Sequence, residues 1–117
     1  MTRKSQVSDT LTRLEATIVQ RLAASPETSY VAKLHAKGLA KIAQKVGEEA
    51  TETVIAALAG DDAELVGEAA DLLFHLMVLL AEKGVPIDSV LAELDRREGM
   101  SGIAEKEARA QKAARTE

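Results

Sequence analysis

The apolar residues near the start of the chain recur every three or four positions, which is the spacing of one face of an α-helix. They predict an amphipathic helix through LTRLEATIVQRLAA, with Ser8 or Asp9 as its N-cap. The apolar stripe of this helix consists of Leu11, Leu14, Ile18 and Leu22. The following SPETS segment, which contains Pro26, ends the helix and predicts a turn.

A second and longer helix is predicted from Tyr30 to about Leu58. Its buried stripe is expected to consist of Leu39, Ile42, Val46, Ala50, Thr53 and Ala57, with Glu49 on the edge. Gly38 and Gly47 lie inside this segment, and each costs up to about 1 kcal/mol relative to alanine in a helix. Their presence predicts either a kink or the close approach of a neighbouring helix or a ligand.

Two further helices are predicted after short turns. The AGDD turn leads into a third helix that extends to about Glu82, and its segment AADLLFHLMVLLA is apolar nearly all the way round. A helix of that kind is expected to be buried on several sides. After Gly84, Pro86 begins a fourth helix that ends at Gly99. The packing stripe of the fourth helix consists of Ile87, Val90, Leu91 and Leu94.

These patterns predict an all-α fold with four main helices in an antiparallel bundle, followed by a polar helical tail at the C-terminus. Composition agrees, because 46% of the 117 residues are hydrophobic and only 2% are aromatic, so leucine, valine, isoleucine and alanine must form the core. The length predicts a single domain over residues 1–117, with residues 1–7 and about 110–117 loose. The apolar third helix suggests that dimerisation completes the bundle.

Charge and composition exclude several classes of function. The formal charge is −4, and the basic residues are spread along the chain, which argues against a nucleic-acid partner. The chain has no cysteine, so disulfides, thiolate metal sites and thiol nucleophiles are excluded. No segment approaches the ~18 apolar residues of a membrane span, and MTRKSQ lacks the apolar run of a signal peptide. We therefore expect a soluble, cytoplasmic protein with no membrane partner.

Two acidic clusters present an electrostatic problem. Glu48, Glu49 and Glu52 lie in the second predicted helix, and Glu68 and Asp71 lie in the third. Acids three and four residues apart share a helix face, where like charges repel one another. The second cluster lies on or beside the apolar stripe of its helix, and burying an ionised carboxylate without a partner costs several kcal/mol.

A hard divalent cation would resolve this problem. Carboxylate oxygens suit Mg²⁺, with Mn²⁺ as a possible substitute, whereas Zn²⁺ would be expected to recruit histidine or cysteine. Taken alone, the first cluster is best explained as a solvated helix face, whereas the second is equally compatible with a buried salt bridge and with a metal. Together, on consecutive helices, they favour a metal site. Because Mg²⁺ held by a few carboxylates keeps positions for phosphate oxygens, phosphoryl chemistry is indicated.

The residues that flank the acids have two interpretations each. His75 lies one turn beyond Asp71 and either orients a metal ligand or a water beside the ligands, or is a hydrogen-bonded core histidine. Lys41 and Lys45 precede the first cluster and either bind phosphate or form a solvated basic face. His35 has no acidic neighbour at helical spacing.

The only aromatic residues are Tyr30 and Phe74. Core packing is expected for both, with base stacking as the alternative.

At this point the motifs resemble a known family. Glu48-Glu49-x-x-Glu52 followed by Glu68-x-x-Asp71 resembles the metal signature of the MazG-like all-α nucleoside triphosphate pyrophosphohydrolases. More narrowly, SYVAKLHAKGLAKIAQKVGEEATE, EAADLLFHLMVLLAEKGV and REGMSGIAEKEAR resemble the phosphoribosyl-ATP pyrophosphohydrolase family, over most of the chain. The resemblance implies Mg²⁺-dependent hydrolysis of phosphoribosyl-ATP to phosphoribosyl-AMP and pyrophosphate, the second step of L-histidine biosynthesis. It also implies a homodimer or larger assembly with sites near the interface.

The resemblance assigns roles to the candidate residues. The metal ligands it implies are Glu49, Glu52, Glu68 and Asp71. The catalytic candidates are Glu48 and Glu49, and of the two Glu48 is the candidate for a second metal or for activation of the attacking water. Lys45 and Lys41 would contact phosphate oxygens.

Two rival functions stay open at this stage. A housekeeping pyrophosphohydrolase of ordinary or damaged nucleoside triphosphates would share the same metal core. A non-catalytic helical dimerisation module would pair its acids with arginines of a partner. A di-iron bundle is disfavoured, because neither His35 nor His75 has a glutamate three residues before it.

Overall fold

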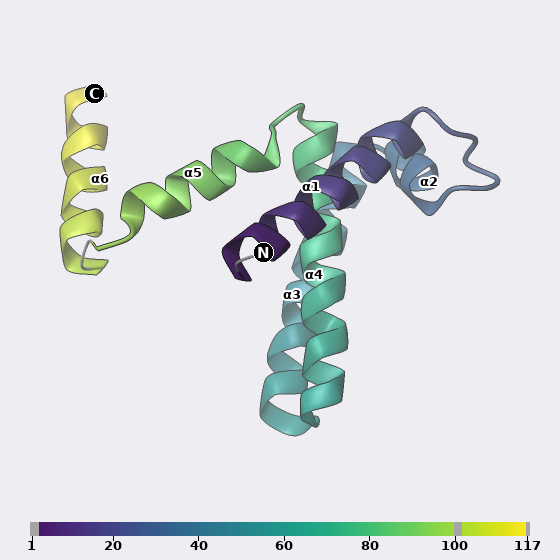
Figure 1. The fold of residues 1–117 in the computed structure, drawn as a ribbon, viewed down its shortest axis with the longest axis horizontal. Coiled ribbons are helices and arrows are strands. Elements are labelled where there is room, and N and C mark those ends of the chain that lie inside the picture. Colours follow the sequence, from purple (N-terminus) through teal and green to yellow (C-terminus); the bar gives the residue numbers. More distant parts are fainter. Residues whose placement is uncertain (1–2, 100–101, 117) are drawn as a thin grey trace. The chain divides into compact units, whose positions relative to one another are not determined.

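The computed structural model describes residues 3–99 and 102–116, and within them every regular element is an α-helix (Figure 1). The helices are α1 (Arg3–Leu22), α2 (Tyr30–Lys37), α3 (Leu39–Ala59), α4 (Asp62–Glu82), α5 (Ile87–Arg97) and α6 (Gly102–Thr116). The predicted all-α fold is confirmed, and none of the described helices is long and apolar enough to cross a membrane.

The chain divides into two compact units, Met1–Ile87 and Asp88–Glu117, and each is described by itself. The predicted single domain over residues 1–117 stays a prediction. So does the predicted looseness of residues 1–7 and about 110–117. Helices α1 and α6 extend into those ranges, while residues 1–2 and 117 lie outside the described part of the chain.

The first unit is built on an antiparallel pair formed by α3 and α4 (Figure 1). Gly60 and Asp61 join them, and the Asp61 carboxylate caps α4 by accepting a hydrogen bond from the backbone N–H of Glu64 at 2.8 Å. Helix α1 packs across α4, and α2 contacts both α1 and α3. The buried hydrophobic residues are Ile18, Val31, Ala32, Leu34, Ile42, Ala56, Met77, Val78 and Ile87.

The predicted continuous helix from Tyr30 to Leu58 is wrong, because the chain breaks at Gly38. This glycine has φ +99°, which side chains of L-residues rarely adopt, and it serves both as the C-cap of α2 and as the N-cap of α3. Gly47, by contrast, continues α3, and no atom lies within 4 Å of the position a Cβ would take. The kink predicted for the two glycines is therefore found at Gly38 alone, and no close neighbour explains Gly47.

The buried positions of α3 are Ile42, Glu49 and Ala56, seven residues apart. This spacing is that of the contact line of two helices packed along their length. Glu49 therefore lies in the middle of the buried stripe and not on its edge, as the sequence predicted. Leu39, which was expected to be buried, is 41% exposed.

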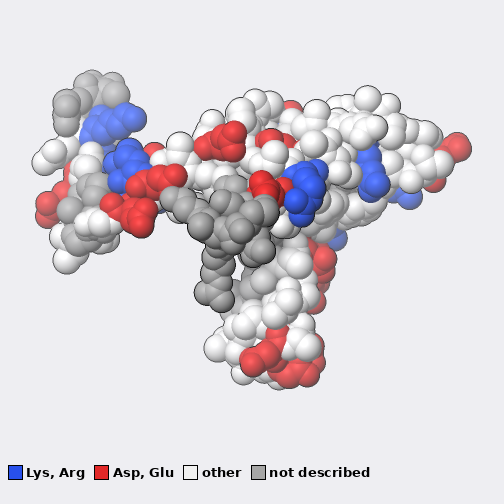
Figure 2. Space-filling view, viewed as in Figure 1, with Lys and Arg blue, Asp and Glu red and all other residues white. Residues whose placement is uncertain are grey.

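The prediction that the third helix is buried on several sides is confirmed for residues 74–82 of α4, which are all buried or half-buried, and is wrong nearer the turn. There Val66 and Leu73 are 69% and 52% exposed, and Val54, Ile55 and Leu58 of α3 are also exposed. The reason is visible in the ribbon, where the turn end of the α3–α4 pair extends beyond α1 (Figure 1). The space-filling view shows acidic side chains gathered at that end (Figure 2). We call Val54, Ile55, Leu58, Val66 and Leu73 the exposed apolar residues of the pair.

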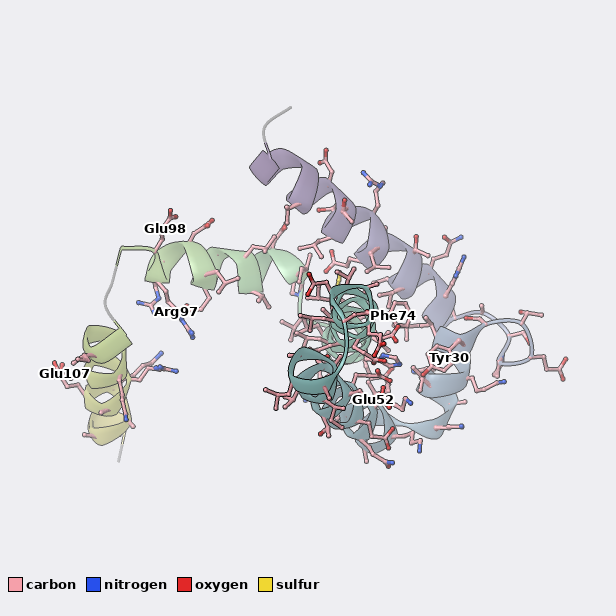
Figure 3. The ribbon with its side chains drawn as sticks, turned by 90° about the horizontal axis from the view of Figure 1, so that it is seen from below. Tyr30, Glu52, Phe74, Arg97, Glu98 and Glu107 are labelled. Atoms are coloured by element: carbon pink, nitrogen blue, oxygen red, sulfur yellow. The ribbon has the colours of Figure 1, made fainter. Side chains whose placement is uncertain are left out.

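Helix α5 begins at Ile87, one residue later than predicted, so that Pro86 directly precedes the helix and does not occupy its first position. Its first backbone N–H donates to the Glu15 carboxylate of α1 at 2.6 Å. In the second unit, Arg96 and Arg97 surround Glu93, with closest distances of 2.6 and 3.1 Å, and hydrogen bonds from them lower the pKa of Glu93 to about 2. Side chains of this unit are drawn in Figure 3.

Candidate metal centre

Carboxyl groups from α3 and α4 converge on one side of the antiparallel pair. One oxygen each from Glu49, Glu68 and Asp71 lies within 4.8 Å of the others. Glu52 follows Glu49 by one turn, and its carboxyl group is within hydrogen-bonding reach of those of Glu49 and Glu68. The antiparallel packing explains the convergence, since it brings the second half of α3 beside the first half of α4. We call Glu49, Glu52, Glu68 and Asp71 the carboxylate cluster.

Two oxygens of the carboxylate cluster are buried without a hydrogen-bond partner. They are Oε2 of Glu49, a residue that is only 7% exposed, and Oε2 of Glu68. A buried polar atom left without a partner loses its hydration and gains nothing in return. Divalent cations with a preference for hard oxygen ligands satisfy such atoms and offset the charge, so the donor set fits Mg²⁺ or Mn²⁺.

The packing of these acids alters their protonation. Burial raises the pKa of Glu49, and a hydrogen bond with Glu52 and the charge of Glu52 raise it further. For Glu68, the hydrogen bond with Glu52 is the largest cause of a raised pKa, followed by burial and by the neighbouring negative charges. The two acids therefore hold protons at higher pH than isolated glutamates do.

Glu48 and Lys45 lie at the border of the cluster. The Lys45 ammonium nitrogen is 3.4 Å from Oε2 of Glu48 and 3.7 Å from Oε1 of Glu49. Gln44 donates a hydrogen bond of 2.7 Å to the other oxygen of Glu48. Hydrogen bonds from Gln44 and Lys45, with the charge of Lys41 as a smaller cause, lower the pKa of Glu48. The structure thus brings Lys45 to the cluster, whereas the oxygens of Glu48 are engaged on its outer side.

His75 is 5% exposed, and both of its ring nitrogens are engaged. Nδ1 lies 2.7 Å from the carbonyl oxygen of Asp71, and Nε2 lies 2.8 Å from the hydroxyl of Tyr30. Because a carbonyl oxygen only accepts, Nδ1 carries the hydrogen, and Nε2 then accepts from the tyrosine. The structure therefore places His75 as a hydrogen-bonded residue behind Asp71.

Tyr30 was missed by the sequence-based reasoning, which expected it in the core. It is 48% exposed, and its ring stacks on Phe74 with the centroids 6.3 Å apart (Figure 3). Burial raises the pKa of its hydroxyl, Lys45 lowers it, and nearby carboxylates raise it. No spacing rule links Tyr30 to His75, because they are 45 residues apart.

His35 was expected to have no acidic partner within its own helix. Its Nδ1 lies 2.7 Å from the carboxylate of Glu82, which belongs to α4. This contact and the Tyr30–His75 hydrogen bond are two separate side-chain links between α2 and α4.

A groove of about 420 Å³ borders the cluster and runs toward the turn between α3 and α4. Acidic, small and apolar residues line it: Glu52, Ile55, Ala56, Ala59, Gly60, Glu64, Gly67, Glu68 and Asp71. It offers space for an extended polar ligand beside the carboxylates.

Comparison with known proteins gives matches over most of the chain. A family model described as phosphoribosyl-ATP pyrophosphohydrolase matches residues 11–98. A phosphoribosyl-ATP pyrophosphatase of Novosphingobium aromaticivorans is 76% identical over 99 residues, covering 85% of this chain and 92% of the relative. Proteins of the same name from Rhizorhabdus wittichii and Zymomonas mobilis are 71% and 60% identical, covering 88% and 86% of this chain and 97% and 94% of the relatives.

Proposed function

Since this chain belongs to the phosphoribosyl-ATP pyrophosphohydrolase family, within the MazG-like all-α superfamily, we propose that it hydrolyses phosphoribosyl-ATP to phosphoribosyl-AMP and pyrophosphate. The reaction would be the second step of L-histidine biosynthesis, carried out with Mg²⁺ at the carboxylate cluster. A cytoplasmic location is part of the same proposal.

The observation that carries the proposal is the pair of buried carboxylate oxygens without a partner, Oε2 of Glu49 and Oε2 of Glu68. A site meant only to stabilise the fold would place apolar or fully paired groups between α3 and α4. Four converging acids, two of which have an unsatisfied buried oxygen, instead suit a cation that arrives from solution. Mg²⁺ and Mn²⁺ fit the all-oxygen donor set, and a triphosphate is the usual companion of such a cation.

The residues of the site would have different roles in the reaction. Glu49, Glu52, Glu68 and Asp71 would hold the cation, which when bound offsets charge on phosphate oxygens and lowers the pKa of a bound water. Lys45 would contact a phosphate oxygen as a point charge, in exchange for its contacts with Glu48 and Glu49.

Two further residues keep their predicted roles. Lys41, one turn earlier on α3, is the second candidate for phosphate. Glu48 is the candidate for a second metal or for water activation. Its lowered pKa keeps Glu48 ionised, as a metal ligand must be, and makes it a weaker base than an ordinary glutamate.

The reaction is tested by offering phosphoribosyl-ATP and a panel of nucleoside triphosphates to the purified protein with Mg²⁺ and identifying the products. We expect phosphoribosyl-AMP and pyrophosphate from the first substrate. Preference for ordinary or damaged nucleoside triphosphates would instead favour a housekeeping pyrophosphohydrolase.

The site itself is tested by Glu68→Gln, with Asp62→Asn as the matched control on the same helix. Glu68 belongs to the cluster, whereas Asp62 is an exposed acid at the start of α4, outside the cluster and the groove lining. Activity of Glu68→Gln near that of the wild type, with the fold intact, would exclude the cluster as the active site.

Self-association also belongs to the proposal. The exposed apolar residues of the α3–α4 pair include Leu58, at 84% exposure, and large apolar side chains in such number are rarely left in water. A second copy would cover them and complete the bundle. Sedimentation should therefore give a dimer or larger species for the wild type and a smaller one for Leu58→Glu.

A further inference from the structure

Two side-chain links join α2 to α4, and they differ in their distance from the carboxylate cluster. Tyr30 binds His75, which lies one turn beyond Asp71. His35 binds Glu82, which is about two further turns along α4. If the links only fixed α2 to α4, the two would be equivalent, but only the first reaches the cluster.

The hydrogens of the first link have a fixed direction. The Asp71 carbonyl oxygen requires the hydrogen of His75 on Nδ1, so Nε2 accepts the hydroxyl hydrogen of Tyr30. A tyrosine hydroxyl has a single hydrogen, and here it points at His75. The lone pairs of the tyrosine oxygen are therefore available to a donor on its other side.

The Tyr30 hydroxyl lies near the carboxylate cluster. The pKa of the hydroxyl responds to the charges of Glu49 and Asp71, which belong to the cluster, and of Lys45 and Glu48 at its border. Nearly half of the tyrosine surface is open, while His75, which holds the hydroxyl, is buried. Tyr30 therefore lies partly in solvent, close to the cluster.

We infer that Tyr30 is a positioning residue of the metal centre, whose hydroxyl oxygen, with its hydrogen held by His75, accepts a hydrogen bond from a water molecule bound to the cation at the cluster. The inference rests on the proposed function, because it requires a cation there. His75 has a defined part in it. Without His75 the hydroxyl hydrogen would turn toward the carboxylates and compete with the cation for their oxygens.

The first test needs no substitution. A ¹⁵N spectrum of the histidine side chains of the metal-free protein should show His75 protonated on Nδ1 and bare on Nε2, although free histidine in water favours the opposite tautomer. A proton on Nε2 would make Tyr30 an acceptor from His75 and would overturn the inference. His35→Gln removes the only other histidine and so assigns the signals.

The second test measures cation binding by calorimetry with Mg²⁺ and Mn²⁺. Tyr30→Phe and His75→Phe are each expected to raise the dissociation constant at least tenfold, the usual effect of losing a partner of a metal's ligands. The kcat should fall with little change in KM. His35→Gln, which removes the other link between α2 and α4, should leave the dissociation constant within about twofold, against the 10–100-fold range typical of such a partner.

The outcomes separate the inference from the proposed function. A wild type that binds no divalent cation would overturn both. A wild type that binds the cation while Tyr30→Phe binds it equally well would overturn the inference alone. A loss in His35→Gln as large as that in Tyr30→Phe would also overturn it, because docking of α2 would then explain the effect.

Discussion

Replacing Glu49 by glutamine should separate two effects of the carboxylate cluster, namely the stability that it costs the metal-free protein and the cation binding that it provides. The substitution keeps the size of a side chain that is only 7% exposed and removes one negative charge from three converging carboxyl groups. The amide also supplies an N–H donor that neighbouring carboxylates accept. The metal-free variant is therefore expected to unfold at the same temperature as the wild type or higher.

With the cation bound, the wild type should instead unfold at a higher temperature than Glu49→Gln. At a free Mg²⁺ concentration 100 times the wild-type dissociation constant, binding stabilises the wild type by about 2.7 kcal/mol. A 100-fold weaker site gains only about 0.4 kcal/mol at the same concentration. With a shift of about 4 °C per kcal/mol for a chain of this size, the melting temperature should rise by about 11 °C in the wild type and about 2 °C in Glu49→Gln.

Calorimetric melting with Mg²⁺ and with EDTA measures both effects in one series. Asp62→Asn is the matched control, because it removes an exposed acid from α4 outside the cluster and the groove lining. If Mg²⁺ only screened a diffuse negative surface, the two variants would lose the same part of the shift in melting temperature. A full shift in Glu49→Gln, or an equal loss in Asp62→Asn, would refute the reasoning.

Three further predictions follow from the same geometry. The raised pKa values of Glu49 and Glu68 keep protons on the folded protein, so the stability of the metal-free protein should fall as the pH rises from about 4.5 through those values. Mg²⁺ affinity should rise over the same pH range. Urea midpoints measure the stability and calorimetry the affinity, and an affinity independent of pH would contradict the prediction. Gly38→Ala should lower the free energy of unfolding by about 1–3 kcal/mol because of the positive φ, whereas Gly47→Ala should raise it by about 0.5–1 kcal/mol; equal urea midpoints would contradict the helix break. Lys45→Gln should raise the KM for the triphosphate about tenfold, which corresponds to a loss of about 1.4 kcal/mol in substrate binding, without weakening Mg²⁺ binding. An unchanged KM would exclude the phosphate contact.

The sequence predicted the helices well because their apolar periodicity is strong and their turns carry Gly, Pro and Asp. It failed at Gly38, where the flanking residues on both sides have good helical propensity. A single glycine inside a helical pattern is compatible with a kink, a close contact or an uninterrupted helix, as Gly47 demonstrates. Only the backbone conformation distinguishes these cases.

The carboxylate cluster was predictable because its spacing within each helix is fixed by helical geometry. Its partners were not, since they depend on how α2 packs. Tyr30 reaches His75, and His35 reaches Glu82, across 45 and 47 residues of chain. The engagement of Glu48 with Gln44 and Lys45 is local, but three- and four-residue spacing alone does not say which of several acids a lysine selects.

The position of Glu49 in the seven-residue contact line has an evolutionary consequence. Ile42 and Ala56 fill the equivalent places one repeat before and after it, so an apolar residue at position 49 would complete a better core. Selection for thermal stability alone would favour such a replacement, and selection for cation binding would remove it. Laboratory evolution toward heat resistance without an activity screen is thus expected to select apolar replacements of Glu49, which would inactivate the protein.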